Sequence, residues 1–428
     1  MKQNVWIWNH YATSMFFDQA GRHYWFAENL IKEGYKATIF CANTNHFSDN
    51  HIDTKGRKYS VDSVNSIPFV FVNTPEYKEN GKKRLLNMIS FYRGIFKTAE
   101  TYAKLNGKPD VILASSVHPL TLVAGIKIAK KFDIPCICEV RDLWPESIVA
   151  YGSLNRNSLI AKLLYQGEKW IYKKADRIIF TMEGGKDYII DKKWHSLRSG
   201  AININKVFYL NNGVDLKQFN ENKVKYSIND NDLNSDKFKV IYTGSIRAVN
   251  DVEYFVETAR QLKLLNQKDI ELLIYGDGPE RERLVQKCER ENLDNIKFKG
   301  RVPKQSIPYI LSKANLNILH FQQNSIKKYG ASLNKLFEYF ASGKPIISDC
   351  EFGYDLVKRY KCGLVFDKSY PEDMAKEIVN IKELDPFEYK NLCENSLKAS
   401  NEYDYKNLTT QLIRLLNMED KVYEIKSV

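Results

Sequence analysis

Residues 327–348 read KKYGASLNKLFEYFASGKPIIS and combine a helix, a stop signal and a strand in one stretch. Apolar side chains from Leu336 to Phe340 predict a buried helix, Gly343 predicts its end, and PIIS predicts the strand that follows. A helix that leads directly into a buried strand is the building unit of an α/β sheet. The helix also carries Lys335 and Glu338. Because a core helix rarely needs a carboxylate, we regard it as a candidate binding element.

The second half of the chain repeats this alternation of helices and strands. Helices are expected over 252–265, 281–292 and 306–314. Strands are expected in VFYL (207–210), KVIYTGS (239–245), ELLIY (271–275), NIKFKG (295–300), NILHF (317–321), PIIS and GLVF (363–366). A polar excursion, rich in Asn, Asp and Lys, covers 220–236. The pattern predicts a doubly wound, Rossmann-like domain around a parallel sheet.

The first half shows the same pattern, with a helix expected over 22–33. Its expected strands are Val5–Trp8, Ala37–Cys41, Phe69–Val72, Val111–Ala114, Ile134–Val140 and Arg177–Thr181, a set compatible with one parallel sheet. A chain of 428 residues is too long for one ordinary core. We therefore expect two doubly wound α/β domains, with a boundary between about 195 and 210. Ligands of such domains bind at the carboxyl ends of the strands.

Composition and charge limit the classes of function. The net charge of +12 favours an anionic partner. No apolar run approaches the ~20 residues that span a bilayer, and MKQNVWIWNHY lacks the features of a signal peptide, so we expect a cytoplasmic location. The seven cysteines form no CxxC or Cys/His metal pattern. We expect reduced thiols, no metal and no cofactor.

A basic segment lies between Tyr77 and Lys108, where eight basic residues (Lys78, Lys82, Lys83, Arg84, Arg93, Lys97, Lys104, Lys108) outnumber Glu79 and Glu100 by six. From Arg84 onward, an apolar face at helical spacing is expected to comprise Leu85, Met88, Ile89, Tyr92, Ile95 and Phe96. One interpretation is a basic amphipathic helix whose Lys82, Lys83 and Arg84 meet an anionic membrane surface and a lipid diphosphate. The other is a core-packing helix with a solvated cationic face. Nucleic acid is disfavoured because no recognised binding motif accompanies the charge.

Two glycine-containing loops follow expected strands of the second domain. In YTGSIRAVN, Gly244 and Ser245 stand at a strand end, a helix is expected to start around Asn250, and Arg247 offers donors to a diphosphate. In YGDGPE, Gly276, Gly278 and Glu280 follow the next strand, and glycine permits close approach of a ligand. Ordinary βα turns explain each loop equally well when it is taken alone.

The start of the quoted helix carries the sharper prediction. Ser332 is the expected N-cap, so the N–H groups near Leu333, Asn334 and Lys335 are expected to be available to an anion. Glu338 can accept hydrogen bonds from two adjacent hydroxyls, such as those of a ribose. The alternative is a surface glutamate on an amphipathic helix.

Taken together, the motifs resemble a known family. NNGVD followed by Phe219, YTGSIR, YGDGPE, FKGRV and SLNKLFEYFASGKPII occur in the order and spacing of the retaining glycosyltransferases of family 4, whose fold is GT-B. The resemblance covers nearly the whole chain. EVRDLWPES (139–147) resembles a bacterial subgroup that builds O-antigen and capsule, some members of which transfer N-acetyl-fucosamine. The resemblance to family 4 implies an acceptor domain over 1–205, a donor domain over 206–400, and a C-terminal helix over 401–428 that returns to the first domain.

The resemblance also implies roles for individual residues. Glu338 would bind the donor ribose, and Arg247 with 332–335 would hold the diphosphate. Gly276 to Glu280 and Arg301–Val302 would line the base pocket, and Gly21 would lie on a first-domain loop near the donor phosphates. Three positions depart from the family pattern: Gly330 replaces a sugar-binding glutamate, Ser245 and Asn250 replace a frequent arginine and lysine, and Arg141–Asp142 replaces His-Asp.

These residues suggest a retaining, metal-independent transfer in which Arg247 and Lys335 stabilise the departing diphosphate. His118 and Asp142 are the acceptor-side candidates, although a lone histidine in a βα loop is also a common structural residue. The expected donor is a UDP-sugar, such as a UDP-N-acetyl-hexosamine, and the expected acceptor is a polyprenyl-diphosphate-linked saccharide at the inner face of the cytoplasmic membrane. Two alternatives stay open: a UDP-sugar 2-epimerase of the same fold, and a catalytically inactive nucleotide-sugar-binding partner.

Overall fold

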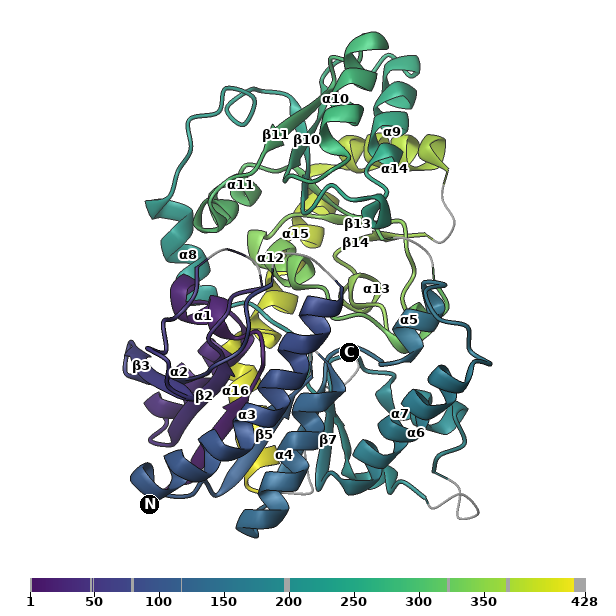
Figure 1. The fold of residues 1–428 in the computed structure, drawn as a ribbon. Coiled ribbons are helices and arrows are strands. Elements are labelled where there is room, and N and C mark those ends of the chain that lie inside the picture. Colours follow the sequence, from purple (N-terminus) through teal and green to yellow (C-terminus); the bar gives the residue numbers. More distant parts are fainter. Residues whose placement is uncertain are drawn as a thin grey trace. The chain divides into compact units, whose positions relative to one another are not determined.

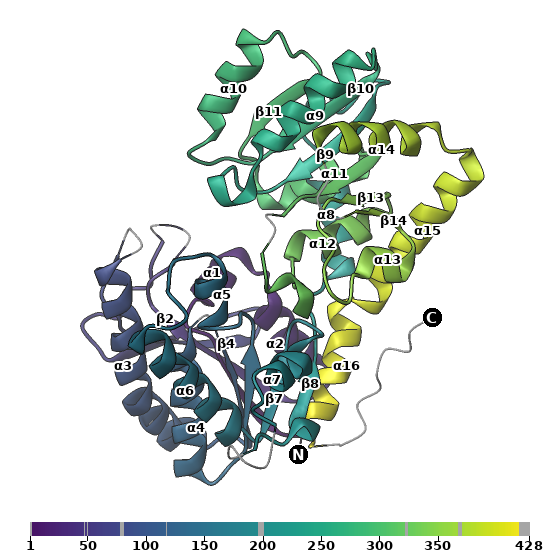
Figure 2. The same ribbon diagram turned by 90° about the vertical axis from the view of Figure 1, so that its right-hand side faces the viewer.

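The computed structural model describes residues 2–418 apart from 47, 49, 78–80, 117, 196–200, 322–323 and 367–369. The chain folds as two compact units, shown in Figures 1 and 2. The first contains the described residues up to Asn211 together with 405–418, and the second contains those of Asn212–Asp404. The chain therefore passes between the units twice, at 211/212 and at 404/405.

The first unit is built on an eight-stranded sheet with the order β3-β4-β2-β1-β5-β6-β7-β8. Its strands are β1 (Asn4–Trp8), β2 (Lys36–Ala42), β3 (Tyr59–Val64), β4 (Ile67–Val72), β5 (Val111–Ser115), β6 (Cys136–Val140), β7 (Arg177–Phe180) and β8 (Val207–Tyr209). All neighbouring pairs are parallel except β3 with β4. Every residue of β5, β6 and β7 is buried, as expected for strands covered by helices on both faces.

Two features of this sheet differ from the sequence prediction. Strand β3 was not expected, and it makes the sheet mixed because it forms a hairpin with β4. Its turn residues Asn65 and Ser66 both have positive φ angles, of 50° and 65°, as a tight hairpin turn requires. Strand β8 was assigned to the second domain, but it pairs in parallel with β7 and closes the first sheet.

The helices of the first unit are α1 (Thr13–Asp18), α2 (Arg22–Lys32), α3 (Lys82–Asn106), α4 (Pro119–Phe132), α5 (Glu146–Ala150), α6 (Leu159–Lys174), α7 (Gly185–Asp191) and α16 (Tyr405–Leu416). Helix α16 packs beside α2, as the purple and yellow ribbons of Figure 1 show. The Tyr405 ring lies 4.7 Å from that of Trp25 and 5.3 Å from that of Phe26. Helix α16 therefore belongs to the first unit, and it starts at Tyr405, whereas the sequence prediction started the C-terminal helix at 401.

The second unit contains a six-stranded, all-parallel sheet with the order β11-β10-β9-β12-β13-β14. Its strands are β9 (Phe238–Thr243), β10 (Ile270–Tyr275), β11 (Ile296–Gly300), β12 (Leu316–Leu319), β13 (Ile346–Ser348) and β14 (Gly363–Val365). Its helices are α8 (Leu216–Lys225), α9 (Glu253–Leu264), α10 (Arg281–Arg290), α11 (Ile307–Ser312), α12 (Asn334–Ser342), α13 (Leu356–Tyr360), α14 (Pro371–Glu383) and α15 (Pro386–Glu402). A buried apolar cluster joins β9, β10 and β12 to α9 and α14. Apart from VFYL, which forms β8 of the first sheet, the predicted strands and helices of this half are confirmed.

Candidate functional site

The loops after β9 and β10 pack directly against one another. The N–H of Gly244 donates to Tyr275 O at 2.9 Å, and the N–H of Ile246 donates to Asp277 O at 2.9 Å. A Cβ on Gly276 would lie 1.7 Å from Gly244 O, and one on Gly278 would lie 2.1 Å from Ile246 O. These glycines therefore make room for the neighbouring backbone, whereas the sequence prediction assigned that room to a ligand.

The β9 loop leaves an arginine exposed. Asn250 donates from Nδ2 to Ser245 Oγ at 2.7 Å, so its amide closes the loop. Asn250 lies in a 3-10 turn (Ala248–Asn250), and α9 starts at Glu253, which is later than expected. Arg247 precedes that turn, is exposed, and forms no side-chain hydrogen bond or ion pair within the described part of the chain. Its guanidinium is thus open to an anion.

Helix α12 begins one residue later than the sequence predicted. Its N-cap is Leu333, which has no side chain that can cap, and the helix starts at Asn334. Ser332, the expected cap, instead accepts the Asn212 N–H on its Oγ at 3.4 Å, and its carbonyl accepts from Asn212 Nδ2 at 3.1 Å. The first turn of α12 contains no acidic side chain. Its N–H groups and positive dipole end are therefore left uncapped.

Lys335 lies beside the end of β9. Its Nζ donates to Tyr242 Oη at 3.2 Å, lies 4.3 Å from the centre of the Tyr242 ring, and would be 2.8 Å from a Cβ on Gly244. Gly244 thus admits the ammonium to the strand end. Burial lowers the pKa of Lys335 to about 8, although Glu338 opposes that shift. Because this pKa lies above 7, Lys335 is mostly charged at neutral pH. It forms no ion pair among the described residues, so its ammonium has no bound carboxylate.

Glu338 lies one turn further along α12 and is half-buried. Burial raises its pKa, while Lys304 and Lys335 act in the opposite direction. The next residue, Tyr339, is buried, and its Oη accepts the Thr243 N–H at 3.0 Å, which fixes this part of the helix against β9. The structure therefore brings Gly244, Lys335 and Glu338 to one sheet edge.

The backbone explains why Gly330 has no side chain. Its φ angle of 92° lies in the region that L-residues rarely adopt, and it ends a short 3-10 turn (Lys327–Tyr329). A glutamate at this position would require a different backbone path. The departure from the family pattern at Gly330 is thus part of the local fold.

The predicted base-pocket residues have different environments. Glu280 pairs with Arg283, whose nitrogens lie 2.8–3.0 Å from Glu280 Oε2, so this carboxylate is already engaged. Arg301 is exposed. Val302 lines a cavity of about 510 Å³ together with Ile228, Asn229, Asp230, Asn231, Asp232, Tyr275 and Lys299.

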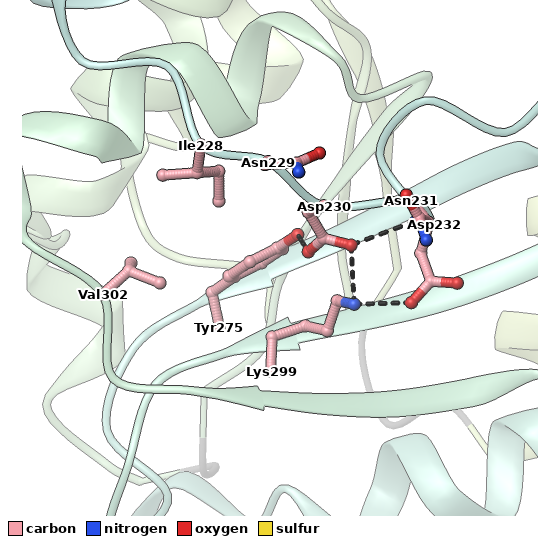
Figure 3. Close-up of a pocket in the computed structure, with 8 residues that line it drawn as sticks. All are labelled: Ile228, Asn229, Asp230, Asn231, Asp232, Tyr275, Lys299 and Val302. Carbon is pink, nitrogen blue, oxygen red and sulfur yellow. Dashed lines mark hydrogen bonds and ion pairs between the residues drawn. The ribbon is translucent and has the colours of Figure 1, made fainter.

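Charged groups inside this cavity neutralise one another (Figure 3). Tyr275 Oη donates to Asp230 Oδ2 at 2.8 Å, and Lys299 Nζ pairs with Asp230 Oδ1 at 2.7 Å. Figure 3 shows Ile228 and Val302 on the side of Tyr275 away from these ion pairs. The polar excursion predicted at 220–236 thus folds over the end of β10 and β11, and Val302 lies at the apolar side of the cavity.

In the first unit, the strand-end polar groups bind one another around Glu139, a residue that the sequence analysis did not single out. Its Oε1 accepts from Ser115 Oγ at 2.7 Å and lies 2.9 Å from His23 Nε2, and its Oε2 pairs with Arg22 at 2.7 Å. Arg22 also donates to the carbonyls of Leu210 and Asn211, beside the first passage between the units. Burial alone would raise the pKa of Glu139. Arg22 and His23 outweigh this effect and hold that pKa well below its usual range.

This network also fixes Gly21, the N-cap of α2, because Arg22 and His23 are the next two residues. A glutamate inside the otherwise apolar strand CICEV is the signal that could have revealed it.

His118 is enclosed in the structure. It is 2% exposed, its Nε2 lies 2.6 Å from His10 Nδ1, and its Nδ1 is buried. Burial, and then the charge of Arg84, lower the pKa of His118 to about 3. The predicted acceptor-side histidine is therefore neutral, and both of its ring nitrogens are covered in this conformation. Asp142, the other candidate, is exposed at the end of β6, and no hydrogen bond joins it to His118 among the described residues.

Helix α3 contains the described part of the basic segment, while Lys78 and Glu79 lie outside the described residues. It buries Met88, Phe91, Ile95 and Tyr102, whereas Leu85, expected on the apolar face, is 56% exposed. The helix thus packs on the core through a face rotated from the predicted one. Arg84 donates from Nε to Tyr11 Oη at 2.9 Å, while Lys82 and Lys83 are exposed.

The described residues contain no group of three or more His, Cys, Asp or Glu side chains placed to hold a metal ion. None of the described helices has the length and apolar character needed to cross a bilayer.

Comparison with known proteins finds two glycosyltransferase family models that match successive parts of this chain. Residues 24–218 match the model described as Glycosyltransferase Family 4, and residues 225–399 match the one described as Glycosyl transferases group 1. No protein in the curated set of sequences matches the chain significantly.

Similar solved structures share the whole architecture at low sequence identity. Sucrose-phosphate synthase from Thermosynechococcus elongatus has a TM-score of 0.70 at 17% identity, over 97% of this chain and 99% of that one. HepE from Anabaena, solved in complex with UDP, has a TM-score of 0.64 at 14% identity, over 98% and 100%. An α,α-trehalose-phosphate synthase (UDP-forming) from Burkholderia vietnamiensis has a TM-score of 0.69 at 13% identity, over 98% and 99%. At these identities the likeness is one of fold.

Proposed function

We propose that the chain is a glycosyltransferase of the family 4, GT-B type, which transfers a sugar from a UDP-sugar to a lipid-linked saccharide with retention of anomeric configuration. The observation that carries the proposal is the arrangement at the edge of the second sheet. An unpaired ammonium, Lys335, lies beside Gly244 at the first turn of a helix that has no capping side chain. Such a site suits a diphosphate.

The proposed mechanism uses these cations at the moment of bond cleavage. As the bond between the anomeric carbon and the diphosphate breaks, negative charge grows on the departing phosphate oxygens. Lys335, Arg247 and the N–H groups at the start of α12 stabilise this charge without needing to reorganise. The acceptor hydroxyl attacks the anomeric carbon from the side on which the diphosphate leaves, and its proton passes to an oxygen of the departing diphosphate. Because the protein's own cations supply the charge, we propose that a metal ion is not required.

Donor recognition is proposed to depend on Glu338. Its half-buried carboxylate, one turn beyond Lys335, would accept hydrogen bonds from the two ribose hydroxyls. UDP is the favoured nucleotide because HepE, which shares the fold, was solved with UDP and with UDP-glucose. The sugar is proposed to be an N-acetyl-hexosamine such as N-acetyl-fucosamine, on the strength of the EVRDLWPES motif.

The acceptor side is proposed to lie on the first unit. Asp142 offers an exposed carboxylate at the end of β6, and the exposed Lys82 and Lys83 begin α3. These lysines would meet the diphosphate of a polyprenyl carrier at the inner face of the cytoplasmic membrane. Such a role fits capsule or O-antigen synthesis.

Thermal-shift measurements with a panel of nucleotides test the donor class. UDP and UDP-sugars are expected to raise the melting temperature, and absence of stabilisation by UDP, GDP or their sugars would contradict the proposal. Product analysis with a UDP-N-acetyl-hexosamine then tests the reaction. Transfer should require the polyprenyl-diphosphate saccharide and persist in EDTA, whereas donor turnover without acceptor would identify a 2-epimerase.

A further inference from the structure

Helix α6 carries an apolar stripe that faces solvent. Leu159 is 78% exposed, Leu163 is 72% exposed and Trp170 is 37% exposed, and Ile160 beside them is 63% exposed. Residues 159, 163 and 170 are four and seven positions apart, so their side chains project from one side of the helix. Leu159, Ile160 and Leu163 therefore form an apolar patch on the first turns of an exposed helix, and Trp170 lies two turns further along the same side.

The opposite side of α6 already faces the core. Ala161, Glu168, Ile171 and Tyr172 are buried there. Glu168 accepts hydrogen bonds from Tyr172 and Tyr188, each at 2.8 Å, so this side is fully used by the fold. A helix that is apolar on two sides needs a second covering surface.

The exposed charged side chains of α6 are all cationic. Lys162, Lys173 and Lys174 are exposed, Lys169 is half-buried, and the single acidic residue of α6 is the buried Glu168. If a second copy covered the stripe across a two-fold axis, these lysines would face the same lysines of that copy. An anionic surface meets no such repulsion.

The most exposed end of the stripe lies at a defined edge of the first unit. Helix α6 leads directly into β7, so it runs antiparallel to the strands and starts at their carboxyl ends. Helix α3 starts at the same edge, where Leu85 and Leu86 are 56% and 54% exposed beside Lys82 and Lys83. Helix α4 contacts both, as Figure 2 shows.

We propose that the first turns of α6 and α3 form a membrane-docking surface that inserts Leu159, Ile160 and Leu163 into an anionic bilayer. Trp170 would then lie at the level of the headgroups, and the flanking lysines would contact the lipid phosphates. This surface places the carboxyl edge of the first sheet next to the membrane. This inference rests on the proposed function, because a lipid-linked acceptor requires the enzyme to work at a membrane.

Vesicle flotation of the full chain tests the surface. Wild-type protein is expected to bind vesicles of phosphatidylglycerol and phosphatidylethanolamine, and to bind phosphatidylcholine vesicles far more weakly. L159E/L163E should reduce binding by about a hundredfold, roughly tenfold per leucine removed from the bilayer. K162Q should reduce binding to anionic vesicles about fivefold. The matched control is L105E, because Leu105 is 74% exposed but lies at the other end of α3.

Three results would overturn this assignment: equal binding of L159E/L163E and wild type, equal loss of binding in L105E, or a wild-type dimer that L163E dissociates without changing vesicle binding. Melting curves confirm that each variant is folded. UDP binding by L159E/L163E should equal that of wild type. If the wild-type protein binds vesicles but not UDP, the donor proposal fails while the membrane surface stands.

Discussion

The two sheet edges of this molecule use their charged residues in opposite ways. At the edge of the first sheet, Glu139, Arg22, His23 and Ser115 satisfy one another and are buried. At the edge of the second sheet, Arg247 and Lys335 have no carboxylate partner within the described part of the chain, and α12 starts without a cap. A closed network holds a fold in place, whereas unpaired cations beside a helix start are prepared for an anion.

Removing the centre of the closed network should give the largest effect. Glu139→Ala leaves the Arg22 guanidinium buried without its partner, which costs about 3–5 kcal/mol. We expect the melting temperature to fall by roughly 10 °C for a chain of this size. The control is Glu221→Ala, whose side chain is 63% exposed. An unchanged melting temperature for Glu139→Ala would show that the network does not hold the first edge.

At the open edge, Lys335→Ala should damage function and spare stability. Loss of one preorganised donor to a developing charge lowers kcat by about 10²–10³-fold, while the melting temperature should stay close to that of wild type. Lys390→Ala, at an exposed site, serves as the control. Wild-type affinity for UDP should also decline as the pH rises through about 8, because Lys335 then loses its proton. Lys335→Arg should keep that affinity to higher pH.

The first edge should instead show its pH dependence on the acid side, in stability. Burial holds the pKa of His10 well below 6.5 and that of His118 at about 3. Below pH 6.5 the unfolded chain binds protons that the folded pair of histidines does not bind. The free energy of unfolding therefore decreases as the pH is lowered. Each histidine contributes at most about 1.4 kcal/mol per pH unit. Urea unfolding at pH 7 and pH 5 should therefore show a loss of roughly 4 kcal/mol for the pair, and about half that loss in His118→Gln. Equal losses in the two proteins would contradict the neutral pair.

Glu338→Gln should weaken donor binding less than Lys335→Ala weakens catalysis. Hydrogen bonds to a charged group contribute about 1.5–3 kcal/mol, so the affinity for UDP should fall about 10- to 100-fold. The affinity for 2′,3′-dideoxy-UDP should not change, because it lacks the hydroxyls that Glu338 binds. Glu394→Gln, with a side chain 60% exposed, is the control. An equal loss for both nucleotides would place Glu338 outside the ribose site.

The smallest effect is expected for Asn250→Ala. Asn250 closes the β9 loop onto Ser245, and the loop lies next to Arg247. Loss of this hydrogen bond should cost about 1 kcal/mol and raise the KM for the donor by a few-fold. A loss of activity comparable with that of Lys335→Ala would mean that Asn250 touches the diphosphate directly.

The sequence predicts the strands and helices of both domains well because hydrophobic periodicity is a local signal. It predicts Lys335 and Glu338 for the same reason, since charged residues on an apolar helix are conspicuous. The cap of α12 was misplaced because Ser332 is engaged by Asn212, a residue distant in sequence. The hairpin of β3 and the place of β8 depend on pairing partners that periodicity does not reveal.

The first edge was less predictable because its residues act through distant partners. Glu139 meets Arg22 and His23 across more than a hundred positions, and His118 is neutral only because His10 and the surrounding core enclose it. Gly276 and Gly278 show the same limit. A glycine that admits a ligand and one that admits a neighbouring loop give the same sequence pattern.

Calorimetric titration of wild-type and Lys335→Ala protein with UDP and with uridine tests most directly whether the open edge holds a diphosphate. We expect UDP to bind wild type much more tightly than uridine does, and Lys335→Ala to weaken UDP binding about tenfold or more while leaving uridine binding unchanged. Equal affinities of the two proteins for UDP, or equal losses for UDP and uridine, would contradict this expectation.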